Sequence, residues 1–136
     1  MPVDVLDEVG YARLDTERAA RLFAASFSNL GLDLERIGEV SVALVDQETI
    51  HDLNLRFRDR DGPTDVLSFE VDGPYGEMVG EVVICPLCAD PEMGVDELVV
   101  HGALHLGGME HGEDFGASEM ARVQQAVMEE LRGQEG

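Results

Sequence analysis

Residues 101–111 read His101-Gly102-Ala103-Leu104-His105-Leu106-Gly107-Gly108-Met109-Glu110-His111 and contain three of the four histidines of the chain. His101 and His105 are four residues apart, so on a helix they share one face and both reach one metal ion at about 2.0–2.1 Å. His111 can join them only if the chain reverses, and the glycines at 107–108 permit that because glycine adopts the left-handed conformation that ends helices. Three neutral imidazoles with an open fourth position form the catalytic type of zinc site. The stretch therefore predicts one Zn²⁺ per chain, bound by His101, His105 and His111.

The residue after the first histidine restricts the chemistry. Proteases with the H-E-x-x-H motif carry a general-base glutamate there, whereas Gly102 has no side chain. The spacing H-x3-H-x5-H, with Gly108 before the third histidine, is otherwise that of the metzincin proteases. A peptidase or amidase thus lacks its usual base, although it stays an alternative. If Gly102 occupies an ordinary helical position, replacing it with alanine is expected to be tolerated or slightly stabilising.

Around this stretch the hydrophobic pattern predicts a mixture of strands and helices. Asp46 and Asp96 are placed to cap helices, and the turn cluster 72–76 joins two strands into a hairpin. The predicted strands are 2–6 at an edge, 40–45, 65–71 and 79–84, and the predicted helices are 15–30, 46–57, 97–106 and 118–131. These elements predict an α+β fold, a small mixed β-sheet with packed helices. The length of 136 residues predicts a single domain over residues 1–136.

Composition limits the class of protein further. Hydrophobic residues make up 44% of the chain, yet no apolar run reaches the roughly 18 residues that a membrane helix needs. The N-terminus has no basic region followed by an apolar stretch, so we expect a cytoplasmic protein without a membrane partner. Two cysteines are too few for a disulfide framework, and Cys85 and Cys88 are interpreted as buried thiols at the end of a strand.

The charge of the chain is strongly acidic. Asp and Glu number 29 against 9 arginines and no lysine, which gives a formal charge of −20 and repels polyanions over most of the surface. Arg56, Arg58 and Arg60 nevertheless place a third of the cations within five residues, and guanidinium groups bind phosphate in a planar fork. This cluster is the candidate phosphate site. The alternative is a solvated loop in which Asp59 and Asp61 neutralise the arginines.

Three blocks of the sequence carry a resemblance to a known family. The pattern His101-Gly102-x-x-His105-Leu106-x-Gly108-x-x-His111 resembles the signature of the YbeY family, single-strand-specific metalloendoribonucleases. Residues 53–69 are similar to the family's Asn-x-x-Tyr/Phe-Arg and Pro-Thr-Asp-Val-Leu-Ser-Phe runs, and residues 80–84 are similar to its Gly-Asp-Ile strand. The resemblance implies a zincin-like metalloenzyme fold, zinc on the three histidines and a functional role for Arg58.

The same resemblance implies an activity. The protein is expected to cleave single-stranded RNA in ribosomal RNA maturation and ribosome quality control, with the small ribosomal subunit as a partner. Arg58 would hold the scissile phosphate, and Glu110, the carboxylate beside the ligands in the sequence, would assist the attacking water or orient a histidine. The alternatives are a zinc peptidase or amidase, and a ribosome-associated binding protein in which zinc is structural. The oligomeric state, the cleavage position and the end chemistry stay open.

The sequence also departs from the family pattern. Glu81 and Glu110 stand where the family usually has aspartate, although neither change removes a metal ligand. The segment from Ile84 to His101 is shorter than in the family, so we expect the helix normally found there to be reduced or missing.

Overall fold

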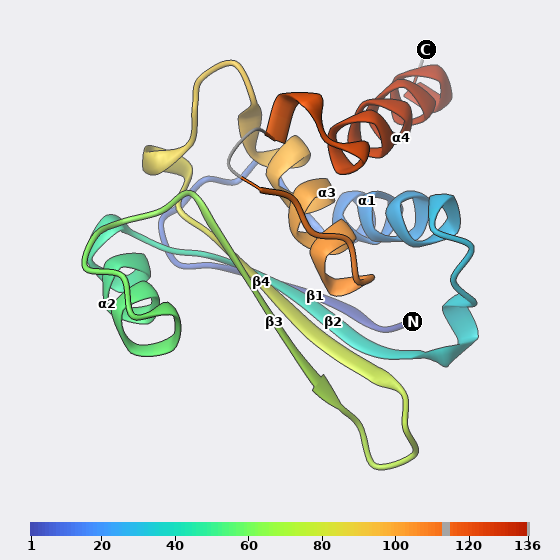
Figure 1. The fold of residues 1–136 in the computed structure, drawn as a ribbon, viewed down its shortest axis with the longest axis horizontal. Helices are drawn as coiled ribbons and strands as arrows, with labels where there is room; N and C mark the ends of the chain where they lie inside the picture. Colours follow the sequence, from blue (N-terminus) through green and yellow to red (C-terminus); the bar gives the residue numbers. More distant parts are fainter. Residues whose placement is uncertain (113–114, 136) are drawn as a thin grey trace.

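The computed structural model describes residues 1–112 and 115–135, and within these ranges it contains four strands and four α-helices (Figure 1). The strands are β1 (Val3–Asp7), β2 (Ile37–Leu44), β3 (Val66–Asp72) and β4 (Met78–Ile84). The helices are α1 (Thr16–Asn29), α2 (Gln47–Arg58), α3 (Gly94–Leu106) and α4 (Glu119–Glu135). Short 3₁₀ turns lie at Leu34–Arg36, Pro86–Cys88 and Phe115–Ala117.

The strands form one mixed sheet in the order β1-β2-β4-β3. Both β1 and β4 run parallel to β2, so Val42 of β2 lies beside Val5 and Val82, whereas β3 runs antiparallel to β4. The β3–β4 hairpin extends beyond the rest of the sheet (Figure 1). The predicted edge strand, hairpin and small mixed sheet are confirmed, and the α+β layout is consistent with a zincin-like fold.

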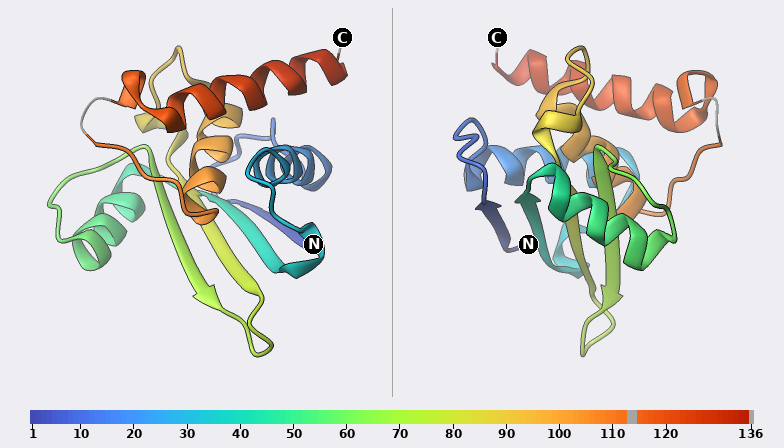
Figure 2. Two further views of the ribbon diagram at one scale, coloured as in Figure 1. Left: turned by 45° about the vertical axis from the view of Figure 1, so that its right-hand side comes forward. Right: turned by 90° about the vertical axis from the view of Figure 1, so that its left-hand side faces the viewer.

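Helices cover both faces of the sheet, because alternate residues of each strand point to opposite sides. In the side views α1, α3 and α4 lie on one face and α2 lies on the other (Figure 2). The larger core, under the three helices, includes Phe23, Phe27, Val40, Val42, Leu44, Val82, Ile84, Leu98, Leu104 and Met120. The smaller core, under α2, consists of Ala43, Val45, Ile50, Leu67, Val83 and Cys85. The helix that carries His101 and His105 is therefore held between the sheet and two other helices.

One of the two predicted helix caps is confirmed, at Asp46, and a further cap lies at Asp15. The Asp15 carboxylate accepts a hydrogen bond from the backbone N–H of Arg18 at 2.8 Å, and that of Asp46 accepts one from Thr49 at 2.8 Å. The predicted cap at Asp96 is wrong, because α3 begins at Gly94, three residues before the predicted helix start at Glu97. Gly94 has a φ of +74°, so the chain turns into the helix at a conformation that glycine adopts without a Cβ penalty.

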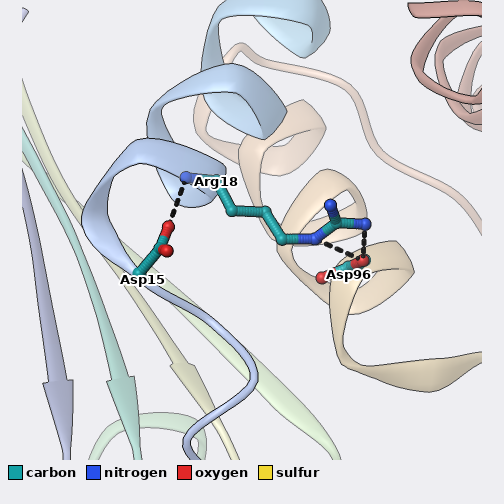
Figure 3. Close-up of polar contacts among 3 residues, drawn as sticks. All are labelled: Asp15, Arg18 and Asp96. Carbon is teal, nitrogen blue, oxygen red and sulfur yellow. Dashed lines mark hydrogen bonds and ion pairs between the residues drawn. The ribbon is translucent and has the colours of Figure 1, made fainter. Parts of the chain in front are cut away.

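Asp96 instead lies in the first turn of α3 and pairs with Arg18 of α1 (Figure 3). Nε of Arg18 donates to Oδ2 of Asp96 at 2.8 Å, and Nη2 donates to the same oxygen. A carboxylate near a helix N-terminus is also favoured by the helix dipole. The pair joins the N-terminal turn of α1 to that of α3, and so helps to hold the helix that carries two of the histidines.

The remaining elements follow the predicted order with shifted ends. β2 begins at Ile37, three residues before the predicted strand, and α4 continues to Glu135. Between β4 and α3, a segment that the structure describes in full, it contains the 3₁₀ turn at Pro86–Cys88 and no α-helix. Within the described ranges, no helix combines the length and the apolar character needed to cross a membrane.

A close contact between α3 and the sheet overturns the expectation for Gly102. A Cβ atom at this position would lie 2.5 Å from Cγ1 of Val82, 2.9 Å from its Cγ2 and 3.1 Å from Oγ of Ser68. The same closeness occurs one turn later, where a Cβ on Gly80 would lie 2.8 Å from Cδ1 of Leu106. Gly102 is therefore not an ordinary helical position, since its missing side chain lets α3 approach β4.

Candidate metal centre

The three histidines converge although His111 lies outside the helix. His101 and His105 share one face of α3 with ring centroids 4.8 Å apart, and the ring of His111 lies 5.2 Å from the first and 5.3 Å from the second. One ring nitrogen from each residue falls within 4.8 Å of the others. The three side chains are thus placed to bind one metal ion.

The glycines after α3 produce the reversal that brings His111 back. Gly108 has a φ of +101°, and the N–H of Met109 donates to the carbonyl of Leu104 at 3.0 Å, the six-to-one hydrogen bond of a Schellman motif. The predicted chain reversal at 107–108 is therefore confirmed. It depends on glycine at position 108, because other residues adopt this φ only with strain.

Hydrogen bonds orient all three histidine rings in the same way, with Nδ1 of each ring facing an oxygen. Nδ1 of His101 lies 2.9 Å from Oε1 of Gln124, Nδ1 of His105 lies 2.9 Å from the carbonyl of Met109, and Nδ1 of His111 lies 2.8 Å from the carbonyl of Gly112. Because an oxygen faces each Nδ1, the proton of the neutral ring belongs on Nδ1 and the lone pair on Nε2. Three Nε2 lone pairs are a donor set that fits a catalytic zinc site.

Burial keeps two of the rings neutral. The pKa of His101 is lowered from its ordinary value of 6.5, chiefly because the ring is removed from water. The pKa of His105 is also lowered, first by burial and then by the neighbouring His101. Phe115 contributes to this shielding, with its ring 4.9 Å from that of His101 and 4.8 Å from that of His111. Neutral imidazoles are the form that binds a metal.

The histidines open into a cavity of about 910 Å³ that Arg58 and Arg60 also line. Nη2 of Arg58, at the end of α2, donates to the backbone carbonyl of Ser68 on β3 at 2.8 Å. The hydroxyl of Ser68 in turn donates to the carbonyl of Gly102 on α3 at 3.1 Å. Ser68, which the sequence analysis did not single out, therefore links the arginine to the helix that carries two of the histidines.

The other charges of the arginine cluster have different partners. Arg56 pairs with Asp52 one turn earlier on α2, at 3.2 Å, and does not line the cavity. Asp61 pairs with His51 at 2.7 Å. The alternative in which Asp61 neutralises an arginine is therefore not what the structure shows. His51 is an exposed residue of α2 in this pair, as expected from the sequence.

The carboxylates of the site differ from those expected. Glu110 lines the cavity, but the three Nδ1 atoms already face Gln124, Met109 and Gly112, so the expected orienting role of Glu110 is wrong for these nitrogens. Asp65 and Glu70 line the same cavity, which means that Glu110 is not its only carboxylate. Sequence reasoning missed both, because Glu70 of β3 and Asp65, just before that strand, are distant from the histidines along the chain.

Gln124 was also missed, although the sequence contains a signal for it. Its position on α4 places it on the same apolar stripe as Met120, Val127 and Leu131, and it is 3% exposed. A polar residue inside an apolar stripe is unusual, since a buried polar group must find hydrogen-bond partners. Such a residue is a reason to look for a specific contact.

The two cysteines lie beside each other after the end of β4. Cys85 is buried directly after β4, and Cys88 is half-buried at the end of the following 3₁₀ turn. Burial and a hydrogen bond with Cys85 raise the pKa of Cys88 to about 11. Both cysteines are free thiols at a strand end, and the expected burial is confirmed for Cys85, whereas Cys88 is only partly buried.

Fold and site together define an α+β protein, consistent with a zincin-like architecture, that carries three histidines placed to bind one metal ion. A family model described as Endoribonuclease YbeY matches residues 7–132 of the sequence. The chain belongs to the YbeY family of endoribonucleases.

Individual relatives agree with this assignment. The Endoribonuclease YbeY of Rubrobacter xylanophilus is 69% identical over 132 residues, which cover 96% of each chain. That of Thermobifida fusca is 37% identical over 146 residues, covering 94% of this chain and 92% of the relative. A solution structure of a protein from Thermotoga maritima superposes with a TM-score of 0.58 at 28% identity, and covers 97% of this chain and 90% of that one.

Proposed function

We propose that the protein is a zinc-dependent endoribonuclease that cleaves single-stranded RNA, and that residues 1–136 form one metalloendoribonuclease domain. The observation that carries the proposal is the shared cavity, into which both the three imidazoles and the guanidinium group of Arg58 open. A metal site beside a phosphate-binding group is the arrangement that phosphodiester hydrolysis requires. Membership of an endoribonuclease family supports the same activity.

In this proposal His101, His105 and His111 would hold one Zn²⁺ through their Nε2 atoms. Zinc supplies a Lewis acid that activates water for attack on phosphorus. Three donors from the protein leave a further coordination position open, which suits catalysis rather than a closed structural site. Nδ1 hydrogen bonds keep the rings in the ligating tautomer, and burial keeps His101 and His105 neutral at neutral pH.

Arg58 would bind the scissile phosphate and offset the negative charge that develops on it. The guanidinium of Arg58 has five N–H donors, and its hydrogen bond to the carbonyl of Ser68 uses one of them, so others can bind a phosphate. Arg60 adds a second cation to the same cavity, whereas Asp65 and Glu110 add carboxylates. Glu110 stays in the proposal as a group that takes up a proton from the attacking water, a role that Asp65 can share.

The biological setting rests on the family resemblance. We propose that the substrate is ribosomal RNA, that the small ribosomal subunit is a partner in maturation and quality control, and that the protein works in the cytoplasm. The net charge of −20 would repel RNA from most of the surface and restrict it to the region where Arg58 and Arg60 lie beside the metal site.

The test combines metal analysis with RNA cleavage. Wild-type protein loaded with Zn²⁺ should contain about one ion per chain and cut an end-labelled single strand faster than the same sequence in a duplex. His105→Ala should lose both zinc and cleavage, because two ligands hold zinc poorly against water. His51→Ala is the matched control, since His51 is an exposed helical histidine that pairs with Asp61, and it should retain both.

Other outcomes would contradict the proposal. Zinc-loaded protein that hydrolyses peptides or amides but not RNA would support the alternative zinc hydrolase. Protein that unfolds without zinc, yet turns over neither substrate when loaded, would support a ribosome-associated protein with structural zinc.

A further inference from the structure

Gln124 is one of only three buried polar side chains in the described part of the chain. Its amide lies between α4 and α3, with Oε1 2.9 Å from Nδ1 of His101 and Nε2 2.9 Å from Oε2 of Glu97. Glu97 and His101 are four residues apart on α3, so they present their side chains on the same face. Gln124 therefore bridges two residues of the helix that carries the metal ligands.

The direction of the bridge follows from the chemistry of its ends. An ionised carboxylate accepts hydrogen bonds and donates none, so the NH₂ group of Gln124 must face Glu97. The amide oxygen then faces His101, and an oxygen there requires the proton of the neutral ring on Nδ1. Nε2 keeps its lone pair. A reversed amide would set two oxygens against each other at Glu97 and would favour the tautomer that carries its proton on Nε2, which leaves Nε2 without a lone pair for the metal.

We propose that Glu97 and Gln124 are a positioning pair that fixes His101 as an Nε2 ligand. Gln124 acts through His101, and Glu97 acts through Gln124. The inference rests on the metal site proposed above, and it adds two residues that do not touch the metal.

His101 is the one ligand whose orientation depends on side chains. His105 and His111 donate to the backbone carbonyls of Met109 and Gly112, which no substitution removes. An amide side chain, in contrast, has two possible orientations and needs a partner that selects one. Glu97 is that partner, and its removal should affect His101 without changing the groups that hold the other two rings.

The experiment measures Zn²⁺ affinity by competition with a chromophoric chelator, and the visible spectrum of the Co²⁺-loaded protein as a second readout. Gln124→Met keeps the volume but removes the acceptor, so the dissociation constant should rise about 10- to 100-fold. Glu97→Gln keeps an acceptor oxygen, but it no longer selects one orientation of the Gln124 amide. The dissociation constant for Zn²⁺ should then rise about twofold, since half of the Gln124 amides still present their oxygen to His101. Glu97→Met should raise the dissociation constant for Zn²⁺ more than Glu97→Gln does.

The double variant tests whether Glu97 acts on His101 only through Gln124. Because Glu97 acts only through Gln124, Glu97→Met combined with Gln124→Met should bind Zn²⁺ no more weakly than Gln124→Met alone. Gln125→Met is the matched control, because Gln125 is an exposed neighbour on α4 that contacts Glu129 and no ligand, and its affinity should equal that of the wild type. Thermal unfolding of the metal-free variants establishes that they fold.

The outcomes separate this inference from the proposed function. Wild-type protein that binds no Zn²⁺ would overturn the metal site itself. Tight wild-type binding with unchanged affinity in folded Gln124→Met would overturn the positioning pair alone, as would additive losses in the double variant. If Gln124→Met does not fold, Glu97→Met provides the test, since Glu97 is only half-buried and its replacement should leave the fold intact. Unchanged Zn²⁺ affinity in Glu97→Met would overturn the inference.

Discussion

Gly102 of α3 faces Val82 of β4 so closely that a Cβ on the glycine would lie 2.5 Å from the valine Cγ1. Real Cβ contacts do not occur at this distance, and the neighbouring atom belongs to a side chain that is fully buried in the larger core. The helix next to the first metal ligand is therefore pressed against the sheet. The position therefore has no room for a side chain unless Val82 or α3 moves.

Replacing Gly102 with alanine should consequently destabilise the protein. The added methyl group must displace Val82 or move α3, and overpacking of this kind costs about 1–3 kcal/mol of the free energy of unfolding. Urea denaturation of the metal-free protein measures the change. Combining Gly102→Ala with Val82→Ala should cost less than the sum of the two single substitutions, because the second makes room for the first. Gly133→Ala in α4 is the control, since nothing lies within 4 Å of a Cβ there, and it should be neutral or stabilising.

The stability of the metal-free protein should depend on His101 and His105 below neutral pH. Folding lowers both pKa values from 6.5, so below about pH 6.5 the unfolded chain binds more protons than the folded chain. The free energy of unfolding is then highest above pH 6.5, falls as the pH drops toward the lowered values, and levels off below them. The measurement is urea denaturation between pH 7.5 and 5.

A variant that lacks both rings isolates this contribution from the carboxylates. His101→Asn combined with His105→Asn should show a smaller decrease over the same pH interval. Equal decreases in the two proteins would contradict the burial that lowers these pKa values.

Removing the guanidinium of Arg58 should reduce RNA cleavage without removing zinc. Loss of a group that stabilises charge in the transition state costs about 10²- to 10³-fold in kcat, so Arg58→Ala should lose this much. Arg56→Ala removes the same charge from the same helix, but Arg56 pairs with Asp52 outside the cavity, and its effect should be no more than a few-fold. Comparable losses in the two variants would mean that total charge, and not the position of Arg58, limits the reaction.

Cys88 should react slowly with thiol reagents in the folded protein. Its pKa is raised from 9.0 to about 11, so the reactive thiolate is about 100-fold rarer than in a thiol with the unshifted pKa. Labelling with a chromogenic disulfide at pH 8 measures the rate. Both cysteines should react rapidly once the protein is unfolded in urea, and fast labelling of a native thiol would show that this region opens readily.

Local sequence determined the parts of the site that lie within one or two turns of helix. His101 and His105 share a face because of the helical repeat, and Gly108 reverses the chain because glycine adopts a positive φ. Asp15 and Asp46 cap helices through hydrogen bonds to residues three positions away. All of these features depend on hydrogen bonds and spacings between residues that are close in the sequence, so they can be predicted from the sequence alone.

The tertiary structure alone decided how distant segments meet. The strand order β1-β2-β4-β3 brings Ser68 between Arg58 and Gly102, and places Val82 under the glycine. Because α3 begins at Gly94, Asp96 does not cap the helix and instead pairs with Arg18 of α1. The packing of α4 on α3 gives His101 its acceptor, Gln124. Periodicity shows that such residues face a core, but the residue each one meets there depends on the relative placement of whole elements, which no local spacing encodes.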